Sequence, residues 1–289
     1  MGGRGKTPLV ALVAKLLLAA GERPAILSRG YGRRIREDGV VVVSDGVHLS
    51  ADLDRSGDEP LMLAHTVPGA AVLVCEQRAI AAALADRVIG ATVHILDDGF
   101  QHRSMRRDLD IVVIAPKDLK DRRVPFGRLR ESPRALRAAD AIVIDGRRED
   151  VDLGASSCPT FVMTRHLGEP AAIEPSHAAP ARGAKVVAVA GIAGPERFQR
   201  ALEAAGWSVA RLLPFRDHHR YVPADLRAFD QAVRETGAEC VLTTEKDAVR
   251  LRPLRPLSVP VFAVPLTVAL DPSAAFETWL RDRLREIRS

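Results

Sequence analysis

The chain begins with a glycine-rich run that is followed directly by a lysine and a threonine. Such runs form phosphate-binding loops, because glycine lets backbone N–H groups converge on phosphates at the N-terminus of the next helix. Lys6 would reach the β- and γ-phosphates of ATP, and the Thr7 hydroxyl would bind Mg²⁺. The first glycine of the full pattern would fall before residue 1, and an ordinary glycine-rich helix entry is the alternative. The residues expected to bind the nucleotide are Gly2, Gly3, Arg4, Gly5, Lys6 and Thr7.

Two adjacent aspartates, Asp97 and Asp98, follow an apolar run that predicts a strand at Thr92–Leu96. Open α/β sheets bind ligands at the carboxyl ends of their strands. A strand that ends in Asp is what a P-loop protein needs to hold Mg²⁺ beside Thr7. An Asp-Asp-Gly sequence on its own is more typical of a turn. Together with the P-loop, it favours a metal site.

A second pair of carboxylates, Asp58 and Glu59, lies in a glycine-led turn before a short apolar segment. One interpretation is a general base for an alcohol nucleophile. The other is a helix cap made by Ser56 or Asp58, which this motif alone favours.

Two adjacent histidines, His218 and His219, lie between an expected strand and an expected helix. Neighbouring side chains point in different directions in most backbones, so we expect at most one of the two to enter a site. A polar surface loop is the alternative.

Short β-branched runs alternate with amphipathic stretches along the chain, which predicts an α/β fold with parallel sheets. Runs such as Ile111–Ile114 are apolar on both faces, as buried parallel strands are. The other expected strands are Ala25–Ser28, Val40–Val43, Ala71–Cys75, Ala141–Ile144, Thr160–Met163, Lys185–Ala190, Ser208–Leu213, Cys240–Thr244 and Val261–Val264. The expected helices are Lys6–Ala19, Arg78–Val88, Pro195–Ala205, Pro223–Thr236 and Ser273–Ile287.

A cluster of Pro, Ser, Gly and acidic residues between 147 and 183 predicts a linker. We therefore expect a core at residues 1–150, a linker at 151–183 and a second, smaller α/β domain at 184–289 that includes the C-terminal helix. The core would be a parallel sheet of the P-loop NTPase type.

The net charge of +5 is concentrated in one segment, since Lys117–Arg137 holds eight bases against three acids. Such a patch suggests a phosphorylated ligand, an anionic membrane surface or nucleic acid as the partner; a solvated face is the alternative. The three cysteines form no CxxC pair, which argues against a disulfide framework or zinc site and for a reducing, cytoplasmic setting. Lys15 interrupts the apolar run Pro8–Ala20, so we expect neither a transmembrane span nor a signal peptide.

Nine short motifs follow one another along the chain: Gly2–Pro8, Ser28–Gly32, Gly57–Pro60, Asp97–His102, Arg106–Ile111, Gly127–Glu131, Gly191–Phe198, Asp217–His219 and Thr244–Val249. Together they closely resemble the tetraacyldisaccharide 4′-kinase family of the lipid A pathway, from residue 1 to about residue 265. The resemblance implies transfer of the ATP γ-phosphate to the 4′-hydroxyl of a tetraacylated glucosamine disaccharide 1-phosphate, giving lipid IVA. It also implies a second domain joined by a two-stranded linker, with the site in the cleft.

Matched by position, the resemblance implies that Asp58 is the catalytic base and that His218 pairs with it. It places Thr7, Asp97 and Glu131 around Mg²⁺. The residues expected to bind the lipid substrate are Asp98, Gln101 and His102, together with Arg29, which lies in the loop after an early strand and could hold a phosphate of the lipid or of the membrane. The enzyme would be peripheral, at the cytoplasmic face of the inner membrane, with no nucleic acid and no obligate protein partner.

Members of this family usually begin several tens of residues earlier, with a strand that leads into the P-loop and an apolar helix that contacts the membrane. We therefore expect a core that lacks this segment and a membrane contact made by Lys117–Arg137. Two other classes share parts of the pattern, a P-loop ATPase switch of the partition or metallochaperone type and a cytosolic small-molecule kinase. The switch would not need Gly57–Pro60 or Asp217–His219, and scarce aromatic residues argue against nucleic-acid binding.

Overall fold

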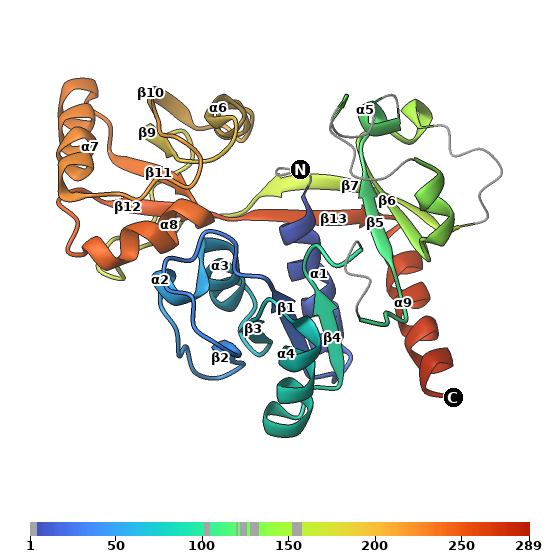
Figure 1. Cartoon of the computed structure of the whole chain (residues 1–289). Coiled ribbons are helices and arrows are strands. Elements are labelled where there is room, and N and C mark those ends of the chain that lie inside the picture. The colour runs from blue at the N-terminus through green and yellow to red at the C-terminus, as the bar shows by residue number, and fades with distance from the viewer. Residues whose placement is uncertain (1–4, 101–104, 120, 122–125, 128–132, 152–157) are drawn as a thin grey trace.

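The computed structural model describes residues 5–100, 105–119, 121, 126–127, 133–151 and 158–289. Over these residues the chain forms three sheets with helices packed on them (Figure 1). Most neighbouring strands are parallel and are connected through helices. The predicted α/β fold with parallel sheets is confirmed.

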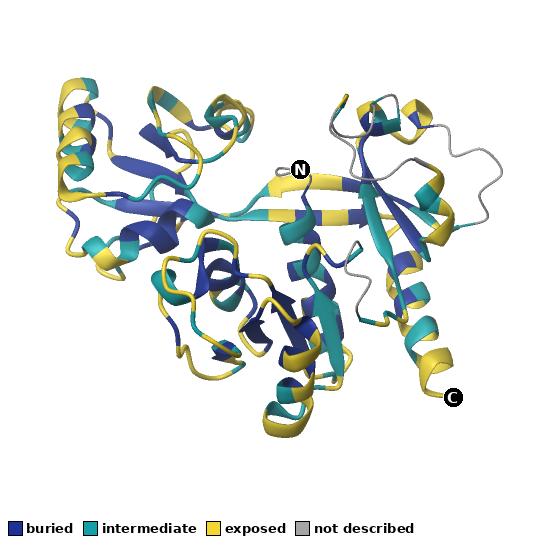
Figure 2. Ribbon diagram, in the orientation of Figure 1, coloured by how far each residue is buried: buried dark blue, intermediate teal, exposed yellow. Residues whose placement is uncertain are grey.

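The first sheet has the strand order β2-β3-β1-β4, with β1, β3 and β4 parallel and β2 antiparallel at the edge. Its strands are β1 (Pro24–Ser28), β2 (Val41–Asp45), β3 (Ala71–Val74) and β4 (Val93–Leu96). Its helices are α1 (Lys6–Ala19), α2 (Leu53–Ser56), α3 (Asp58–Thr66) and α4 (Arg78–Leu84), the last continuing into a π-helical turn at Ala85–Ile89. Every residue of β1 and β3 is buried, in keeping with their continuous apolar sequence (Figure 2).

The second sheet has the order β13-β7-β6-β5, in which β5, β6 and β7 are parallel and β13 is antiparallel to β7. Its strands are β5 (Ile111–Ile114), β6 (Ala141–Asp145), β7 (Thr160–Leu167) and β13 (Leu266–Asp271). The helices along it are α5 (Pro116–Leu119), the 3₁₀ turns Pro133–Ala138 and Arg148–Asp150, and α9 (Ser273–Arg288).

Helix α1 lies between these two sheets, which explains why it is apolar on nearly all sides. Ala11 and Ala14 pack in the cluster of the first sheet. Leu9, Val13 and Leu17 pack in a second cluster with residues of β6, β7 and α9. The helix that follows the glycine-rich run is therefore fixed from both sides, and its N-terminus is held in place.

The third sheet forms a separate lobe with the order β10-β9-β11-β12-β8, parallel except for β8. Its strands are β8 (Ala171–Ala172), β9 (Lys185–Ala190), β10 (Ser208–Pro214), β11 (Cys240–Thr244) and β12 (Val261–Val264). Its helices are α6 (Pro195–Ala204), α7 (Pro223–Thr236), α8 (Glu245–Leu251) and a 3₁₀ turn at Arg252–Leu254.

Strands β7 and β13 run side by side from the second sheet to this lobe (Figure 1). The sequence predicts only the first half of β7 and misses β13. Both strands have polar, exposed positions on the span between the sheets, such as Thr164, Arg165 and Thr267 (Figure 2). The second half of β7 buries neither face, so apolar periodicity could not predict it. Strand β13 does bury Val268 and Leu270 on one face, an alternation that the prediction from the sequence missed.

Helix α9 packs on the core, although the sequence groups it with the second domain. Its residues Phe276 and Leu280 are buried in the same cluster as Leu9 and Leu17 of α1. The chain therefore leaves the core along β7, forms the second lobe, and returns along β13 to end on the core. Among the described residues, no helix is both long and apolar enough to cross a bilayer.

Candidate active site

Helix α1 begins directly after Gly5, which adopts a left-handed conformation with φ of 73°. A Cβ at this position would come within 2.7 Å of the Met163 side chain on β7, so glycine suits both the backbone and the packing. Gly2, Gly3 and Arg4 lie outside the described residues, so only Gly5, Lys6 and Thr7 of the predicted loop are placed.

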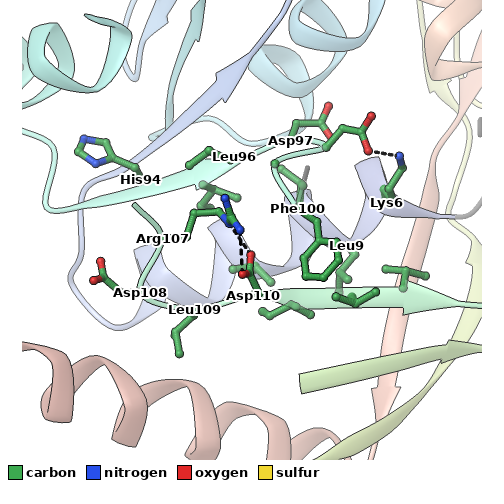
Figure 3. Close-up of a pocket in the computed structure, with 18 of the residues that line it drawn as sticks. Lys6, Leu9, His94, Leu96, Asp97, Phe100, Arg107, Asp108, Leu109 and Asp110 are labelled. Atoms are coloured by element: carbon green, nitrogen blue, oxygen red, sulfur yellow. Dashed lines mark hydrogen bonds and ion pairs between the residues drawn. The ribbon is translucent and has the colours of Figure 1, made fainter. Parts of the chain in front are cut away.

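Lys6 is paired with one of the two aspartates that follow β4. Its Nζ lies 2.5 Å from Oδ1 of Asp98, and both side chains are about half-exposed or less (Figure 3). An ion pair this accessible contributes at most about 1 kcal/mol. The Lys6 ammonium can therefore exchange the carboxylate for a phosphate at little cost. The structure thus brings Lys6 to the end of the predicted strand.

Asp97 is buried, with 7% of its surface exposed. Burial, together with the nearby charge of Glu59, raises the pKa of Asp97 to about 6, against the opposing effect of Lys6. Crowded carboxylates of this kind are stabilised by a bound cation. Mg²⁺ prefers oxygen ligands, and the Thr7 hydroxyl and the Asp97 carboxylate have that chemistry. The third predicted ligand, Glu131, lies outside the described residues, and within them no group of three His, Cys, Asp or Glu residues forms a metal cage.

The two carboxylates after Gly57 begin helix α3. Gly57 has φ of 84°, and a Cβ there would lie 2.7 Å from the Tyr31 carbonyl oxygen, so only glycine lets the two loops touch. Gly57, rather than Ser56 or Asp58, occupies the N-cap of α3. The capping interpretation therefore does not describe the Asp58 side chain.

Asp58 instead bonds a histidine of the other lobe. Its Oδ2 lies 2.8 Å from Nδ1 of His218, which is placed by the loop between β10 and α7. Asp58 is 4% exposed, whereas the His218 side chain is 34% exposed and is the accessible member of the pair. The ring of Tyr31 contacts the imidazole edge-on, with centroids 5.7 Å apart.

The charges around this pair shift both of its pKa values. Burial opposes ionisation of Asp58, but the His218 hydrogen bond and the positive charges of Arg250 and Lys246 outweigh it, so the pKa of Asp58 lies far below its ordinary value. The hydrogen bond to Asp58 raises the pKa of His218, against a smaller opposing effect of burial. Asp58 is therefore a fixed anion, and the imidazole is the group whose protonation changes near neutral pH.

Two residues near the site adopt a left-handed backbone that is uncommon for side chains other than glycine. They are Asp98 and His218, each with φ of 58°. Such conformations cost on the order of 1 kcal/mol and cluster at functional sites. His219 has a different role, because its Nε2 lies 2.9 Å from Asp225 and its ring stacks on Phe215. Only one of the adjacent histidines enters the site, as the sequence predicts.

The sequence assigned no role to the charged residues of α8, which face α3. Lys246 Nζ lies 2.5 Å from Glu59, Arg250 pairs with Asp58, and the Thr66 hydroxyl is 3.0 Å from Glu245. The available signal was the run of charged residues in the Thr244–Val249 motif, next to the apolar residues Ala248, Val249 and Leu251. These contacts hold the second lobe against the core beside the Asp58–His218 pair.

Arg78, at the start of α4, is a further residue that the sequence did not reveal. It is 3% exposed, and its Nε and Nη1 have no hydrogen-bond partner among the described residues. Burial and the nearby charge of Arg29 lower its pKa. Arg29 itself is exposed after β1, and Gln101 and His102 lie outside the described residues. A buried guanidinium with unused donors is suited to an anion.

A cavity of about 500 Å³ lies between β4, β5, α1 and α9 (Figure 3). Lys6, Asp97 and Asp98 line one end of it, and the Arg107–Asp110 ion pair and apolar side chains line the rest. Among the described strands, β4 pairs only with β1 and β5 only with β6, so strand edges border the cavity. Backbone edges need hydrogen-bonding partners, which an acyl chain lacks. We therefore assign only the end with Lys6 to the site.

Comparison with known proteins points to one family. Residues 1–285 match the family described as Tetraacyldisaccharide-1-P 4′-kinase. The tetraacyldisaccharide 4′-kinase of Syntrophus aciditrophicus is 35% identical over 311 residues, covering 99% of this chain and 82% of that protein. The Nitrobacter winogradskyi protein of the same name is 40% identical over 300 residues, with coverage of 100% and 84%.

A solved structure is similar over nearly the whole chain. It is the crystal structure of LpxK from Aquifex aeolicus in complex with ATP, 32% identical in sequence with a TM-score of 0.79. The match covers 98% of this chain and 85% of that one. The P-loop kinase core that the sequence predicts is thereby confirmed.

Proposed function

Because the chain belongs to the tetraacyldisaccharide-1-P 4′-kinase family, we propose that it transfers the γ-phosphate of ATP to the 4′-hydroxyl of an acylated glucosamine disaccharide 1-phosphate, giving lipid IVA. The structural observation that carries this proposal is the Asp58–His218 hydrogen bond. This bond places an imidazole of the second lobe next to a carboxylate of the P-loop core, where the pair can accept a proton from a hydroxyl group. A nucleotide switch that only hydrolyses ATP does not need such a pair.

ATP binds at the N-terminus of α1, with its phosphates against Gly5, Lys6 and Thr7. Lys6 leaves Asp98 and neutralises charge on the transferring phosphoryl group, while the helix N-terminus adds backbone N–H donors. Phosphoryl transfer needs positioning and charge neutralisation more than covalent chemistry, and these groups supply both. Gly2, Gly3 and Arg4, which lie outside the described residues, would complete the loop on the evidence of their sequence.

Asp58 and His218 together remove the proton from the attacking hydroxyl. The resemblance gave Asp58 the role of base, but Asp58 is buried and strongly held as an anion, whereas the imidazole is accessible. We assign the first acceptance of the proton to His218, with Asp58 orienting the ring and stabilising the imidazolium that forms. The proton moves from the sugar hydroxyl to the imidazole as the hydroxyl oxygen attacks the γ-phosphorus and the bond to ADP breaks.

Thr7 and Asp97 would hold Mg²⁺, with Glu131 as a further ligand implied by the sequence. When bound, the ion neutralises charge on the β- and γ-phosphates. The oxygen donors of Thr7 and Asp97 and the crowding of Asp97 by Glu59 support this assignment.

Arg29 and Arg78 would bind a phosphate group of one substrate. Arg29 is exposed, Arg78 is buried behind it, and the two are close enough for the charge of one to lower the pKa of the other. An anion placed between them would relieve this repulsion and use the free donors of Arg78.

The segment Lys117–Arg137 would dock on an anionic membrane surface so that the enzyme reaches a substrate whose acyl chains lie in a bilayer. Much of this segment lies outside the described residues, but Lys117, Arg134 and Arg137 are exposed. Phe126, between the bases, is 84% exposed. Exposed aromatic residues among bases are typical of surfaces that bind membranes.

The function is tested by measuring ATP turnover and product mass with and without a tetraacylated disaccharide 1-phosphate in detergent micelles. We expect ADP release to depend on the lipid and a product heavier by one phosphate. Turnover that ignores the lipid would identify a nucleotide switch. Turnover stimulated by a soluble, deacylated disaccharide 1-phosphate as strongly as by the lipid would identify a small-molecule kinase.

A further inference from the structure

Arg250 on α8 joins carboxylates from the two lobes although it is almost completely buried, with 4% of its surface exposed. Its Nη2 donates to Oδ2 of Asp58 on α3. Its Nη1 donates to Oδ1 of Asp247 at 3.0 Å and to the Gly191 carbonyl oxygen at 2.9 Å. Burying a guanidinium is costly unless its donors are used, and here both terminal nitrogens of Arg250 are hydrogen bonded.

Asp247 anchors this guanidinium from behind and is itself fixed. It has no exposed surface and accepts hydrogen bonds from the Tyr221 hydroxyl at 2.9 Å, the Thr244 hydroxyl at 2.6 Å and the Gly191 N–H at 3.1 Å. The fork of Arg250 therefore has one orientation, set by the second lobe. Because Nη2 of the fixed Arg250 side chain donates to Oδ2 of Asp58, it also restricts the orientation of the Asp58 carboxylate in the core.

The Asp58 carboxylate has little freedom under these contacts. Its Oδ2 accepts from both Arg250 and His218, and its Oδ1 accepts from the Glu59 N–H at 3.0 Å. A rotation of the carboxylate would break at least two of these bonds. The direction from which Asp58 meets Nδ1 of His218 is thus decided by Arg250 as much as by the backbone of α3.

We propose that Arg250 is the positioning residue of the proton-accepting pair, and that it fixes the Asp58 carboxylate in the orientation in which it bonds Nδ1 of His218. Arg250 contacts the Asp58 carboxylate, and among the described residues no hydrogen bond joins it to the imidazole of His218. It acts through Asp58 and is not a catalytic residue. This inference rests on the role proposed above for Asp58 and His218.

Among the described residues, four charged groups lie next to the pair, and their signs decide how a substitution shifts its pKa values. Arg250 and Lys246 are positively charged and belong to α8. Asp217 is negative, and its Oδ1 lies 3.9 Å from Nε2 of His218. Glu59, the residue after Asp58, forms an ion pair with Lys246. Loss of the Arg250 charge makes Asp58 easier to protonate and makes a positive imidazole more favourable. Both effects favour protonation, so the pH at which kcat falls on acidification should move to a higher value.

The test compares Arg250→Met, Arg250→Lys and Arg220→Met. Methionine removes the charge but keeps an apolar chain of similar length, and lysine keeps the charge but not the fork. Arg220 is the matched control, because it pairs with Asp54 across the same two lobes without touching Asp58. For each variant kcat and KM are measured against pH with both substrates, and the His218 imidazole is titrated by NMR.

We expect Arg250→Met to lower kcat on the order of 10²-fold, at the lower end of what a positioned base contributes. The KM for ATP should stay unchanged, and both the acid limb of kcat and the pKa of His218 should move to higher pH. Arg250→Lys should restore the acid limb but recover kcat only in part, and Arg220→Met should leave kcat within about threefold.

The proposal is overturned if Arg250→Met leaves the acid limb and the His218 titration where they are, or if its kcat matches that of Arg220→Met. If Arg250→Met does not fold, Arg250→Lys decides: a kcat lower than that of Arg220→Met at unchanged KM supports positioning, and an equal kcat excludes it. Failure of the proposed base is a separate result, since Asp58→Ala and His218→Ala would then retain full kcat.

Discussion

Asp58 and His218 are hydrogen bonded at 2.8 Å although 160 residues separate them in the chain. Asp58 is a buried anion at the start of α3, and His218 belongs to a loop of the second lobe. The bond exists only when the two lobes are docked through α3 and α8. The proton acceptance that we propose for this pair would therefore require docked lobes, and we make five predictions from the proposed roles of the residues.

Asp58 and His218 are expected to act as one unit. Asp58→Ala and His218→Ala should each lower kcat by about 10²–10⁴-fold, and the double variant should be little worse than the more severe single one. His219→Ala is the matched control and should retain most of the activity, since His219 bonds Asp225 instead. Losses that multiply fully in the double variant would show that the two residues act independently.

The pH dependence of kcat should report the imidazole of His218. Asp58 raises the pKa of His218, so the protonated ring persists above the ordinary value of about 6.5 and cannot accept a further proton. We expect kcat to fall as the pH falls through this raised value. Asp58→Asn removes the anion and should move the acid limb to lower pH in the residual activity. An acid limb that stays in place in this variant would contradict the pairing.

The Lys6 ammonium should stabilise the transferring phosphoryl group. Lys6→Ala is expected to lower kcat on the order of 10³-fold or more. Lys15→Ala offers a control on the same helix, because Lys15 is exposed and lies nine residues after Lys6. Steady-state turnover with saturating lipid measures both. Near-normal kcat in Lys6→Ala would remove the P-loop assignment.

Arg78 is expected to destabilise the free protein and to strengthen the binding of a phosphate group. A buried guanidinium with unused donors destabilises the free protein, so Arg78→Met is expected to raise the free energy of unfolding by about 1 kcal/mol or more. The same change should lower kcat/KM, because the bound phosphate loses its partner. Thermal unfolding and steady-state kinetics test the two effects together, with exposed Arg87→Met as the control. A variant that is less stable than the wild type would show that Arg78 has a structural role.

The basic segment should bring the protein to anionic vesicles. Arg122→Glu, Arg123→Glu and Arg134→Glu together exchange three bases for three acids. Loss of the bases alone, at about 1 kcal/mol each, should lower the affinity on the order of 100-fold, and the added acids should lower it further. Binding by the wild type should weaken as salt rises. Co-sedimentation with phosphatidylserine-containing liposomes measures both effects. The control changes three exposed arginines on other helices, Arg200, Arg227 and Arg281, to Glu. Equal binding by the two triple variants would exclude docking through this segment.

The local elements and the family were predictable from the sequence because their signals are short in range. Continuous apolar runs predicted buried strands such as β9 and β11 to the residue, and the glycine-rich run marked the start of α1. The order of the nine motifs identified the family. Short charged helices were missed, since α8 is only seven residues long and α3 begins within a turn motif. Their form depends on packing rather than on periodicity.

The sequence by itself determined the fold class and the family, and it supplied the residues that we propose for phosphate and proton chemistry. Only the tertiary structure decided how those residues are combined. Docking of α8 on α3 places Arg250 behind Asp58, and the left-handed turn at His218 sets the imidazole against the same carboxylate. Packing of α9 on α1, rather than in the second lobe, follows from complementary apolar faces far apart in the chain. These relationships come from long-range packing and from charged residues that are buried together. Hydrophobic periodicity is a local pattern, so it cannot predict contacts between residues far apart in the chain.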